Sequence, residues 1–426
     1  MIGRKRMVGF PSLLPVEPAF NSLLKNVDIK QPRIKTVGLE DSLGRVCGED
    51  IKSPVDVPDF DRSAVDGYAV RAEDTFGASP TNPIQLKLIG TIHAGDEVEK
   101  LPPLNQGEAI AVLTGAPIPR GANAVVMVEH SRREDNVIEV TRQVHPLQNI
   151  SRRGEDFKKD DVVVKRGTVI KPWHIAALAS LNITEVPIYE ELKIAILSTG
   201  SEIVELGETP GRGKVVNSSK PMLKTLVREA GCRPIDLGTV PDDFEVIVDK
   251  IREGVRIGDM LLVTGGTSVG ERDLVPEAVN RAGNPGVVFH GVKIRPAKPT
   301  GAGVVDGKPV FMLSGYPVSA LIGFQLFVKP LIARFYQMPL EEPCRVRAVL
   351  SRRVANPVDN RSFVRVRVEK HGEKYVAEPL MHTGSGLIST LTRANAMLVI
   401  PEGVEGYEEG EEVEVIMLQP IEAAVK

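Results

Sequence analysis

The chain has 426 residues, of which 42% are apolar and 26% charged, and its formal net charge is −3. The length suggests about three domains of ~150 residues, and the composition is that of a soluble globular protein. The small net charge gives no reason to expect nucleic acid as a partner.

The three cysteines, Cys47, Cys232 and Cys344, lie far apart, with no C-x-x-C pair and no histidine at ligand spacing. This pattern argues against a zinc site and against a disulfide framework, and it fits a reducing cytosol. Pro11 and Pro15 interrupt the segment after the basic residues 4–6, so we do not expect a signal peptide.

The first 190 residues predict two kinds of structure. Residues 55–146 are rich in proline and glycine and carry short apolar runs at 124–128 and 137–140, which indicates a small β-rich unit. The run at 174–181 is helical in pattern, and its region, 168–188, could join the N-terminal fifty residues in a separate, elongated unit.

Residues 193–335 alternate between strand-length apolar runs and helical patterns. The strand candidates are 193–197, 260–263, 287–289 and 310–313. Strands that alternate with helices predict a doubly wound parallel sheet covered on both faces, with ligands at the carboxyl ends of the strands.

Two helices in this region have recognisable starts. In residues 219–230, apolar side chains recur at helical spacing, with Ser218 or Ser219 as the N-cap and Gly231 as the stop. Asp242 followed by Glu245 resembles a capping box for a second helix.

One uncharged segment, residues 310–328, just reaches the ~18 residues of a membrane span. Residues 314–317 divide it into a short strand and a helix that can begin near Pro317. We therefore interpret it as a buried strand, turn and helix, and expect no membrane partner.

The last ninety residues alternate strongly between apolar and polar side chains. The clearest stretches are 345–350, 363–369 and 412–418. A period of two indicates half-buried antiparallel strands, and we expect a small C-terminal β-barrel.

Three loops follow predicted strands: STGSE (198–202), GGTSVGERD (265–273) and SGYPVSA (314–320). Glycines in the second loop allow close approach to an anion, and Glu271 and Asp273 offer oxygen ligands for Mg²⁺. We expect a phosphorylated ligand there. The alternative is a glycine-rich turn without a ligand, because the spacing matches neither G-x-G-x-x-G nor the P-loop.

Three further motifs precede these loops: FDRSAVDGYAV (60–70), LTGAPIPRGANAVVMVE (113–129) and RRGED (152–156). In this order, all six closely resemble the molybdopterin molybdenumtransferase family, the MoeA-like proteins related to the E domain of gephyrin. The resemblance runs from about Leu14 to the C-terminus.

The resemblance implies an elongated, multidomain α/β plus β subunit that forms a homodimer. Domain I would be discontinuous (1–54 and 147–190) and elongated, with dimer contacts. It would flank the β-rich domain II (55–146). Domain III (191–338) would be the central molybdopterin-binding α/β fold, and domain IV (339–426) the small β-barrel. The active cleft would join domain III of one subunit to domain II of the other.

The implied activity belongs to molybdenum cofactor biosynthesis in the cytoplasm. Family members hydrolyse adenylylated molybdopterin in the presence of Mg²⁺, insert molybdate (or tungstate) and release AMP. A molybdopterin adenylyltransferase, or a non-catalytic scaffold like gephyrin, stays open as an alternative.

By the same resemblance the catalytic residues would be Asp66, Thr114, Asp156, Glu202, Asp243 and Asp273. Glu202, Asp243 and Asp273 would hold Mg²⁺ and orient water, with Asp243 preferred to Asp242; the alternative for such loop carboxylates is helix capping. Asp66 could instead be a turn residue, and Asp156 could form an ion pair with Arg152 or Arg153.

The substrate would contact the loops at 198–202 and 265–273, and molybdate would bind to a second group of residues that are mostly lysine and arginine. The substrate residues would be Ser198, Thr199, Gly200, Gly265, Gly266, Thr267 and Ser268; the molybdate residues would be Lys293, Arg295, Lys298, Arg365 and Ser385. Arg365 and Ser385 could equally face solvent. The chain departs from the family pattern at Arg295, where lysine is usual, and at Ser314, where proline is usual.

Overall fold

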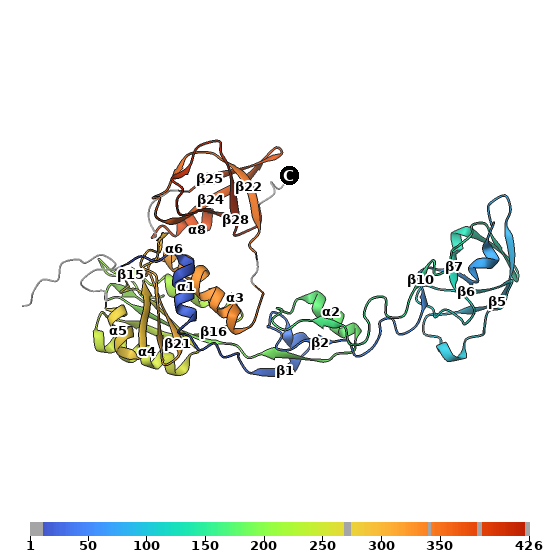
Figure 1. Ribbon diagram of the computed structural model, residues 1–426, viewed down its shortest axis with the longest axis horizontal. Helices are drawn as coiled ribbons and strands as arrows, with labels where there is room; N and C mark the ends of the chain where they lie inside the picture. Colours follow the sequence, from blue (N-terminus) through green and yellow to red (C-terminus); the bar gives the residue numbers. More distant parts are fainter. Residues whose placement is uncertain (1–11, 268–273, 340–341, 381–385, 422–426) are drawn as a thin grey trace, which may run out of the picture. The chain divides into compact units, whose positions relative to one another are not determined.

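The computed structural model describes residues 12–267, 274–339, 342–380 and 386–421, in two compact units (Figure 1). The β-rich unit comprises Thr36–Leu43 and Glu49–Pro187. The α/β–barrel unit comprises Met1–Lys35, Gly44–Gly48 and Ile188–Lys426, apart from the residues that are not described.

The β-rich unit is built around one mixed sheet. Its strands lie in the order β7 (Ala124–Met127), β4 (Gly67–Val70), β6 (Glu108–Val112), β5 (Ile84–Ile92), β9 (Val137–Val140) and β8 (Ser131–Glu134). Apolar side chains are buried on both of its faces, with Tyr68 and Val70 in one cluster and Ala69 in another. The predicted β-rich character is confirmed, including the runs at 124–128 and 137–140.

Short elements flank this sheet in the chain. The strand pairs are β3 (Arg62–Ser63) with β10 (Ile150–Ser151), β2 (Ile51–Lys52) with β11 (Val162–Val164), and β1 (Ile34–Gly38) with β12 (Glu185–Tyr189). The 3₁₀ turns are η1 (Glu40–Ser42), η2 (Ala72–Thr75), η3 (Val98–Lys100) and η4 (Val128–His130). The predicted helix at 174–181 is α2 (Pro172–Ser180), which begins with proline at its first position.

The α/β part of the other unit contains the predicted doubly wound sheet. Its strand order is β16 (Arg233–Val240), β13 (Lys193–Thr199), β17 (Met260–Thr264), β21 (Lys308–Leu313), β20 (Gly301–Val305) and β18 (Pro285–His290). The first four are parallel to one another. The strand predicted at 287–289 exists as β18. It runs antiparallel to β20, and β20 runs antiparallel to β21, so β18 has the direction of the four parallel strands, and β20, which was not predicted, is the antiparallel strand of this described sheet. No helix lies between β18 and β20 in this described stretch, so the chain cannot make a parallel crossover there.

Helices cover both faces of this sheet (Figure 1). They are α1 (Val16–Leu24), α3 (Ser219–Glu229), α4 (Phe244–Ile257), α5 (Val275–Ala282) and α6 (Pro317–Gly323), which continues through a π-helical turn, η5 (Phe324–Val328), into α7 (Lys329–Phe335). One cluster packs alternate residues of β13, Ala195 and Leu197, against the apolar face of α4, including Val248 and Ile251.

The helical stretch Pro317–Phe335 is long and apolar enough to cross a membrane, with a mean hydropathy of 1.4, but 61% of that window is buried inside the protein. It follows β21 directly, as the strand, turn and helix predicted for 310–328. This burial is the pattern of a core helix.

The C-terminal part forms the predicted barrel. Its strands pair in the closed order β24 (Arg361–His371), β25 (Lys374–Pro379), β22 (Arg345–Leu350), β28 (Glu412–Met417), β26 (Ala396–Ile400) and back to β24. The strand β19 (Ile294–Arg295) pairs in parallel with β24, β23 (Val354–Ala355) pairs with β27 (Gly406–Tyr407), and α8 (Ser389–Arg393) precedes β26. The cationic segment around residue 295 is therefore hydrogen-bonded to the barrel.

The two predicted helix starts have different outcomes: Ser218 is the N-cap residue of α3, as predicted, whereas the predicted cap of α4 is off by one residue. The side chain that caps α4 is Asp243, which accepts a hydrogen bond from the Val246 N–H, so the assignment to Asp242 is wrong. At α3, Ser218 occupies the N-cap position without a side-chain bond, and the Asn217 side chain accepts from the Lys220 N–H instead. Gly231, with φ +74°, follows the helix as predicted.

Candidate functional site

The described parts of the three predicted loops meet at one edge of the sheet, because β13, β17 and β21 are neighbours and run parallel. The Gly265 N–H donates to the Leu313 carbonyl at 3.2 Å, and the Thr199 hydroxyl donates to the Thr264 carbonyl at 3.5 Å. Gly265 has φ +88°, and a Cβ on it would collide with the Thr199 carbonyl oxygen. Glycine is therefore required where these loops approach each other.

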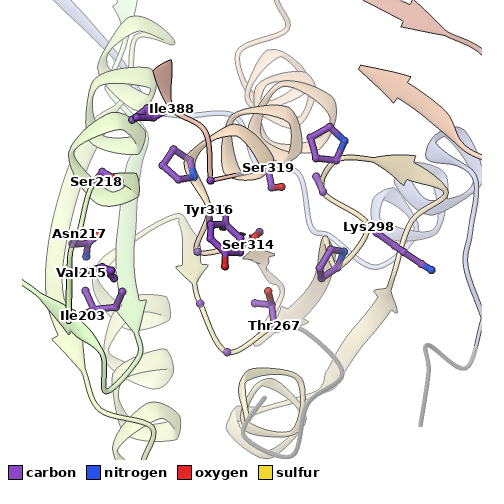
Figure 2. Close-up of a pocket in the computed structure, with 18 of the residues that line it drawn as sticks. Ile203, Val215, Asn217, Ser218, Thr267, Lys298, Ser314, Tyr316, Ser319 and Ile388 are labelled. Carbon is purple, nitrogen blue, oxygen red and sulfur yellow. Dashed lines mark hydrogen bonds between the residues drawn. The ribbon is translucent and has the colours of Figure 1, made fainter. Parts of the chain in front are cut away.

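A pocket of about 870 Å³ opens over this edge (Figure 2). Its volume suits a ligand of several rings rather than a simple ion. The residues that line it are Thr199, Glu202, Ile203, Val215, Val216, Asn217, Ser218, Gly265, Gly266, Thr267, Ile294, Arg295, Pro296, Ala297, Lys298, Pro299, Ser314, Gly315, Tyr316, Pro317, Ser319, Asn360, Gly386 and Ile388.

The predicted substrate residues divide between the pocket wall and the sheet beneath it. Those that line the pocket are Thr199, Gly265, Gly266 and Thr267. Ser198 is buried and shares a 3.0 Å hydrogen bond with Thr264, and the Gly200 N–H donates to the Val240 carbonyl at 3.1 Å. The prediction for Ser268 lies outside the described residues.

His290 supports the glycine-rich loop from the neighbouring edge strand. Its Nε2 lies 2.7 Å from the Thr267 carbonyl, which can only accept, so Nε2 carries the proton. This is a structural use of the histidine, one residue before the loop that leads to the cationic segment.

The predicted acidic residues have different surroundings. Glu202 is exposed and lines the pocket. The Asp243 carboxylate caps α4, whereas Asp242 accepts a hydrogen bond from the Ser201 N–H at 3.1 Å and so ties its own loop to STGSE. The prediction for Asp273 lies outside the described residues. Within the described ranges, no group of three or more metal-ligating side chains is assembled.

The cationic segment contributes two of its three predicted side chains to the pocket. Arg295 and Lys298 line it, and both are exposed. Lys293 instead uses its backbone: its N–H donates to the Leu14 carbonyl at 2.8 Å, and its carbonyl accepts from the Arg361 N–H at 2.9 Å. The segment is thus held on both sides by the main chain.

Arg365 does not face solvent: only 4% of it is exposed. Its Nε donates to the Thr390 hydroxyl at 3.1 Å and its Nη1 to the Phe363 carbonyl at 3.4 Å. The described residues offer it no carboxylate, and burial lowers the pKa of its guanidinium. Arg365 lines a small cavity of about 30 Å³ together with Arg295, Pro296, Ala355, Ser362, Phe363 and Val364. The prediction for Ser385 lies outside the described residues.

In the β-rich unit, Asp66 and Thr114 are brought together. One carboxylate oxygen of Asp66 accepts from the Thr114 N–H at 2.6 Å and from its hydroxyl at 2.8 Å. These two bonds lower the pKa of Asp66, so its carboxylate is ionised well below neutral pH.

Asp156 is exposed, and the predicted alternative of an ion pair with its neighbours is not what the described residues form. Arg153 pairs with Asp56 instead, at 2.8 Å, while the Asp156 N–H donates to the Val57 carbonyl. The Asp156 carboxylate is left facing solvent.

Sequence reasoning missed one wall and the roof of the pocket. The wall is formed by β14 (Ile203–Val204) and β15 (Val215–Val216) with Asn217 and Ser218, and the roof by Asn360, Gly386 and Ile388 of the barrel part. The Tyr316 side chain, 59% exposed, stands between wall and cationic segment (Figure 2). The amide and hydroxyl side chains of NSS at 217–219, directly before a helix, could have indicated this part of the binding pocket. Nothing in the sequence distinguished the pocket residues Asn360, Gly386 and Ile388.

Three sequence families match successive parts of the chain. Residues 14–182 match the MoeA N-terminal region (domain I and II), and residues 195–334 match the family described as "Probable molybdopterin binding domain". Residues 347–418 match the MoeA C-terminal region (domain IV).

Whole-length relatives show the same likeness. A Methanocaldococcus jannaschii protein, named provisionally for molybdopterin biosynthesis, is 42% identical over 96% of this chain and 99% of its own. A molybdopterin molybdenumtransferase of Staphylococcus aureus is 35% identical over 95% and 96% of the two chains. The crystal structure of a MoeA protein from Pyrococcus horikoshii superposes with a TM-score of 0.82 and 38% identity, covering 95% of this chain and 100% of that one.

Proposed function

The chain belongs to the molybdopterin molybdenumtransferase family, and on that premise we propose that it inserts molybdate (or tungstate) into adenylylated molybdopterin, with hydrolysis of the adenylate and release of AMP. The family makes it a transferase of molybdenum cofactor biosynthesis. Water adds to the phosphoanhydride, whose P–O bond breaks to give AMP and the phosphate of molybdopterin, while the two thiols of the dithiolene replace one oxygen of molybdate, which leaves as water.

The observation that carries the proposal is the adjacency of two cavities of different chemistry. Arg295 and Pro296 line both the large pocket and the small cavity that holds Arg365. A guanidinium that is buried without a carboxylate favours an anion as its partner. A large organic ligand and a small oxyanion can therefore bind side by side, as an insertion reaction requires.

On the organic side, the two glycine-containing loops offer hydroxyl and N–H groups. Thr199 and Thr267 present hydroxyls at the pocket, and Gly265 and Gly266 let the backbone approach the ligand's phosphate closely. Tyr316 adds an exposed aromatic ring, which suits a flat heterocycle.

The donor set fits Mg²⁺ through a small number of carboxylates. Glu202 presents an exposed carboxylate to the pocket, and Mg²⁺ is commonly held by one or two carboxylates together with substrate phosphates. We propose Glu202 and Asp273 as the protein ligands; Asp243 would join them only by giving up its cap on α4. When bound, the ion would screen the charge of the phosphoanhydride.

We propose that the functional form is a homodimer, with Asp66 and Thr114 acting in the cleft of the other subunit. An ionised carboxylate suits the orientation of a water molecule, and Asp66 is held in one rotamer by its two bonds from Thr114. Asp156 is proposed for the same cleft. The free cysteines fit a cytoplasmic location.

The test is AMP released from adenylylated molybdopterin in the presence of Mg²⁺, measured by anion-exchange chromatography with and without molybdate or tungstate. We expect oxyanion-dependent release. Tight binding without release would favour a scaffold, and ATP-dependent adenylylation of free molybdopterin would favour an adenylyltransferase.

Arg365→Met probes the oxyanion side separately. We expect it to raise the molybdate concentration for half-maximal release at least about tenfold, because one desolvated charge–anion contact is worth roughly 1.5–3 kcal/mol. Binding of adenylylated molybdopterin and the melting temperature should not fall. The matched control is Arg367→Met, two residues further along the same strand, where the side chain is paired with Glu369 at 2.7 Å. An Arg365→Met enzyme with unchanged molybdate dependence would contradict the assignment.

A further inference from the structure

The wall formed by residues 203–217 is held by little apolar contact. Each residue from 203 to 216 is half-buried or exposed, and Val215 is 53% exposed. The two short strands β14 and β15 pair in parallel, Ile203 with Val215, with an exposed loop between them. Yet this wall supplies one whole side of the pocket, with Ile203, Val215, Asn217 and Ser218 in a row (Figure 2).

Beneath the wall lies a buried ammonium group that the reaction does not use. Lys220, on the first turn of α3, is only 5% exposed. Its Nζ lies 2.6 Å from Glu205 Oε1, in the wall segment, and 3.2 Å from Asp236 Oδ1, on β16 of the central sheet. The ammonium thus joins a weakly packed segment to a rigid one.

The Glu205 carboxylate also has a second hydrogen bond to the central sheet. The Thr239 hydroxyl donates to Glu205 Oε1 at 2.6 Å, and the Asn217 amide donates to the Thr239 hydroxyl at 3.2 Å. Burial by itself would raise the pKa of Glu205, but the bonds from Lys220 and Thr239 lower it overall, so the carboxylate stays charged. Asn217, at the end of this chain of contacts, lines the pocket.

We propose that Lys220 is a positioning residue: with Glu205 and Asp236 it forms a clasp that fixes the 203–217 wall against the sheet and so shapes the pocket for its ligand. Burying a charged side chain lowers the stability of the fold unless the charge is paired. Here the pairing of Lys220 with Glu205 and Asp236 attaches the pocket wall to the central sheet. The inference rests on the proposed function only in taking this pocket as the ligand site.

The first test needs no ligand. Arg212 and Lys214 are exposed trypsin sites within the loop of the wall, and cleavage of a folded protein at such sites follows the fraction of time the segment is open. We expect Lys220→Met to speed cleavage after these two residues about tenfold, as followed by mass spectrometry, with little change at other sites. Lys220→Arg should restore most of the protection.

The matched control is Lys224→Met. Lys224 binds the same Asp236, at 3.0 Å, but not Glu205. Its replacement by methionine therefore removes an ammonium group from Asp236 and leaves the link between Lys220 and the wall in place. If Lys220→Met fails to fold, Glu205→Gln serves in its place, since Glu205 is partly exposed and the amide cannot hold the ammonium as strongly. Equal cleavage in Lys220→Met and the parent, or equal acceleration by Lys224→Met, would overturn the proposal.

The second test ties the clasp to the ligand. We expect Lys220→Met to raise KM for adenylylated molybdopterin about tenfold and to leave kcat within about twofold, because the wall binds rather than reacts. A faster-opening wall with unchanged KM would also overturn the positioning role. Absence of AMP release in the parent enzyme would instead count against the proposed function, and the cleavage test would still decide whether the clasp exists.

Discussion

Asp66 is the residue at which local geometry fixes a charge state. Two donors of Thr114 converge on one of its oxygens, at 2.6 and 2.8 Å, and lower its pKa from 3.8. A lowered pKa means that these bonds contribute to stability above the ordinary aspartate pKa, and that this contribution is lost as the pH falls through the lowered value. At neutral pH the contribution is fully present.

Replacing Thr114 by valine removes the hydroxyl donor and keeps the N–H. We expect the pKa of Asp66 to rise part of the way toward 3.8, because the backbone bond remains and is the larger of the two causes. The measurement is the carboxyl ¹³C shift of labelled aspartate between about pH 2 and 6. Thr114→Ser is the control, and a titration of Thr114→Val that matches the parent would contradict the pairing.

For individual residues, the sequence predicted which side-chain types are used better than which exact residue plays each role. Adjacent aspartates at 242 and 243 have the same chemistry, and only the backbone at the start of α4 decides that Asp243 caps the helix while Asp242 binds Ser201. Arg365 could not be placed either, because whether a strand residue points into a closed barrel depends on register with partners that are distant in the chain.

Among the elements, the loop after β17 depends most on a single residue type. The Gly265 backbone has φ +88° and lies against the Thr199 carbonyl, so Thr199 and residues 265–267 lie together at the wall of the pocket.

Gly265→Ala should therefore disturb both loops. We expect the free energy of unfolding to fall by about 1–3 kcal/mol, because a side chain at this φ is strained and its Cβ also meets the backbone. Binding of adenylylated molybdopterin should weaken in parallel. Urea unfolding and a binding titration measure the two effects. Gly372→Ala is the control for strain alone: Gly372 has φ +63° and open space around it, and ligand binding by this variant should stay at the parent level.

Element types followed from periodicity, but the antiparallel strand of the sheet and the pocket walls did not. The run at 287–289 is β18, whereas β20, which runs antiparallel to both of its neighbours, was not predicted, because the two glycines of its sequence GAGVV weaken a strand pattern. Residues 203–217 have the composition of a loop, and their strands exist because Val215 and Asn217 donate to carbonyls of residues 202 and 204. Such pairing leaves no pattern in a sequence.

For the whole molecule, one arginine connects the N-terminal helix to the barrel. Arg361 donates to both carboxylate oxygens of Glu17, at 2.8 and 3.1 Å, and to Glu402 at 3.1 Å. The hydrogen bond from Arg361 is the main cause that lowers the pKa of Glu17. The parts of this unit are therefore coupled electrostatically as well as through β19.

Glu17→Gln should cost about 0.5–1 kcal/mol of unfolding free energy at pH 7, a small value because Glu17 is largely exposed. The cost should vanish as the pH falls through the lowered pKa of Glu17, below 4.5, since protonation breaks the same pair in the parent. Urea titrations at pH 7 and about pH 3 test this. Asp28→Asn, which breaks an exposed pair with Lys30, should cost nothing measurable at either pH; a constant cost for Glu17→Gln would contradict the linkage.

The proposed dimer makes a prediction that no single subunit can satisfy. Asp66→Ala and Glu202→Ala should each be inactive, and re-equilibrated mixtures should recover about a quarter of the parent rate, because half of the dimers are hybrids with one complete site. Light scattering should give twice the subunit mass of 46.3 kDa. Inactive mixtures of confirmed hybrid dimers would place both residues in one subunit's site.

The pairing of Glu17 with Arg361 also constrains the order in which the protein is made. The two residues are 344 positions apart, so a ribosome adding about 5–20 residues per second needs roughly 20–70 s between them. During that interval the whole β-rich unit, up to Pro187, emerges and can fold on its own contacts. The α1 helix, whose Ala19 and Leu23 are fully buried in the folded protein, can pack against β18 and β20 only after those strands have been made. Its link to the barrel through Arg361 forms later still, after the chain has grown by 344 residues beyond Glu17.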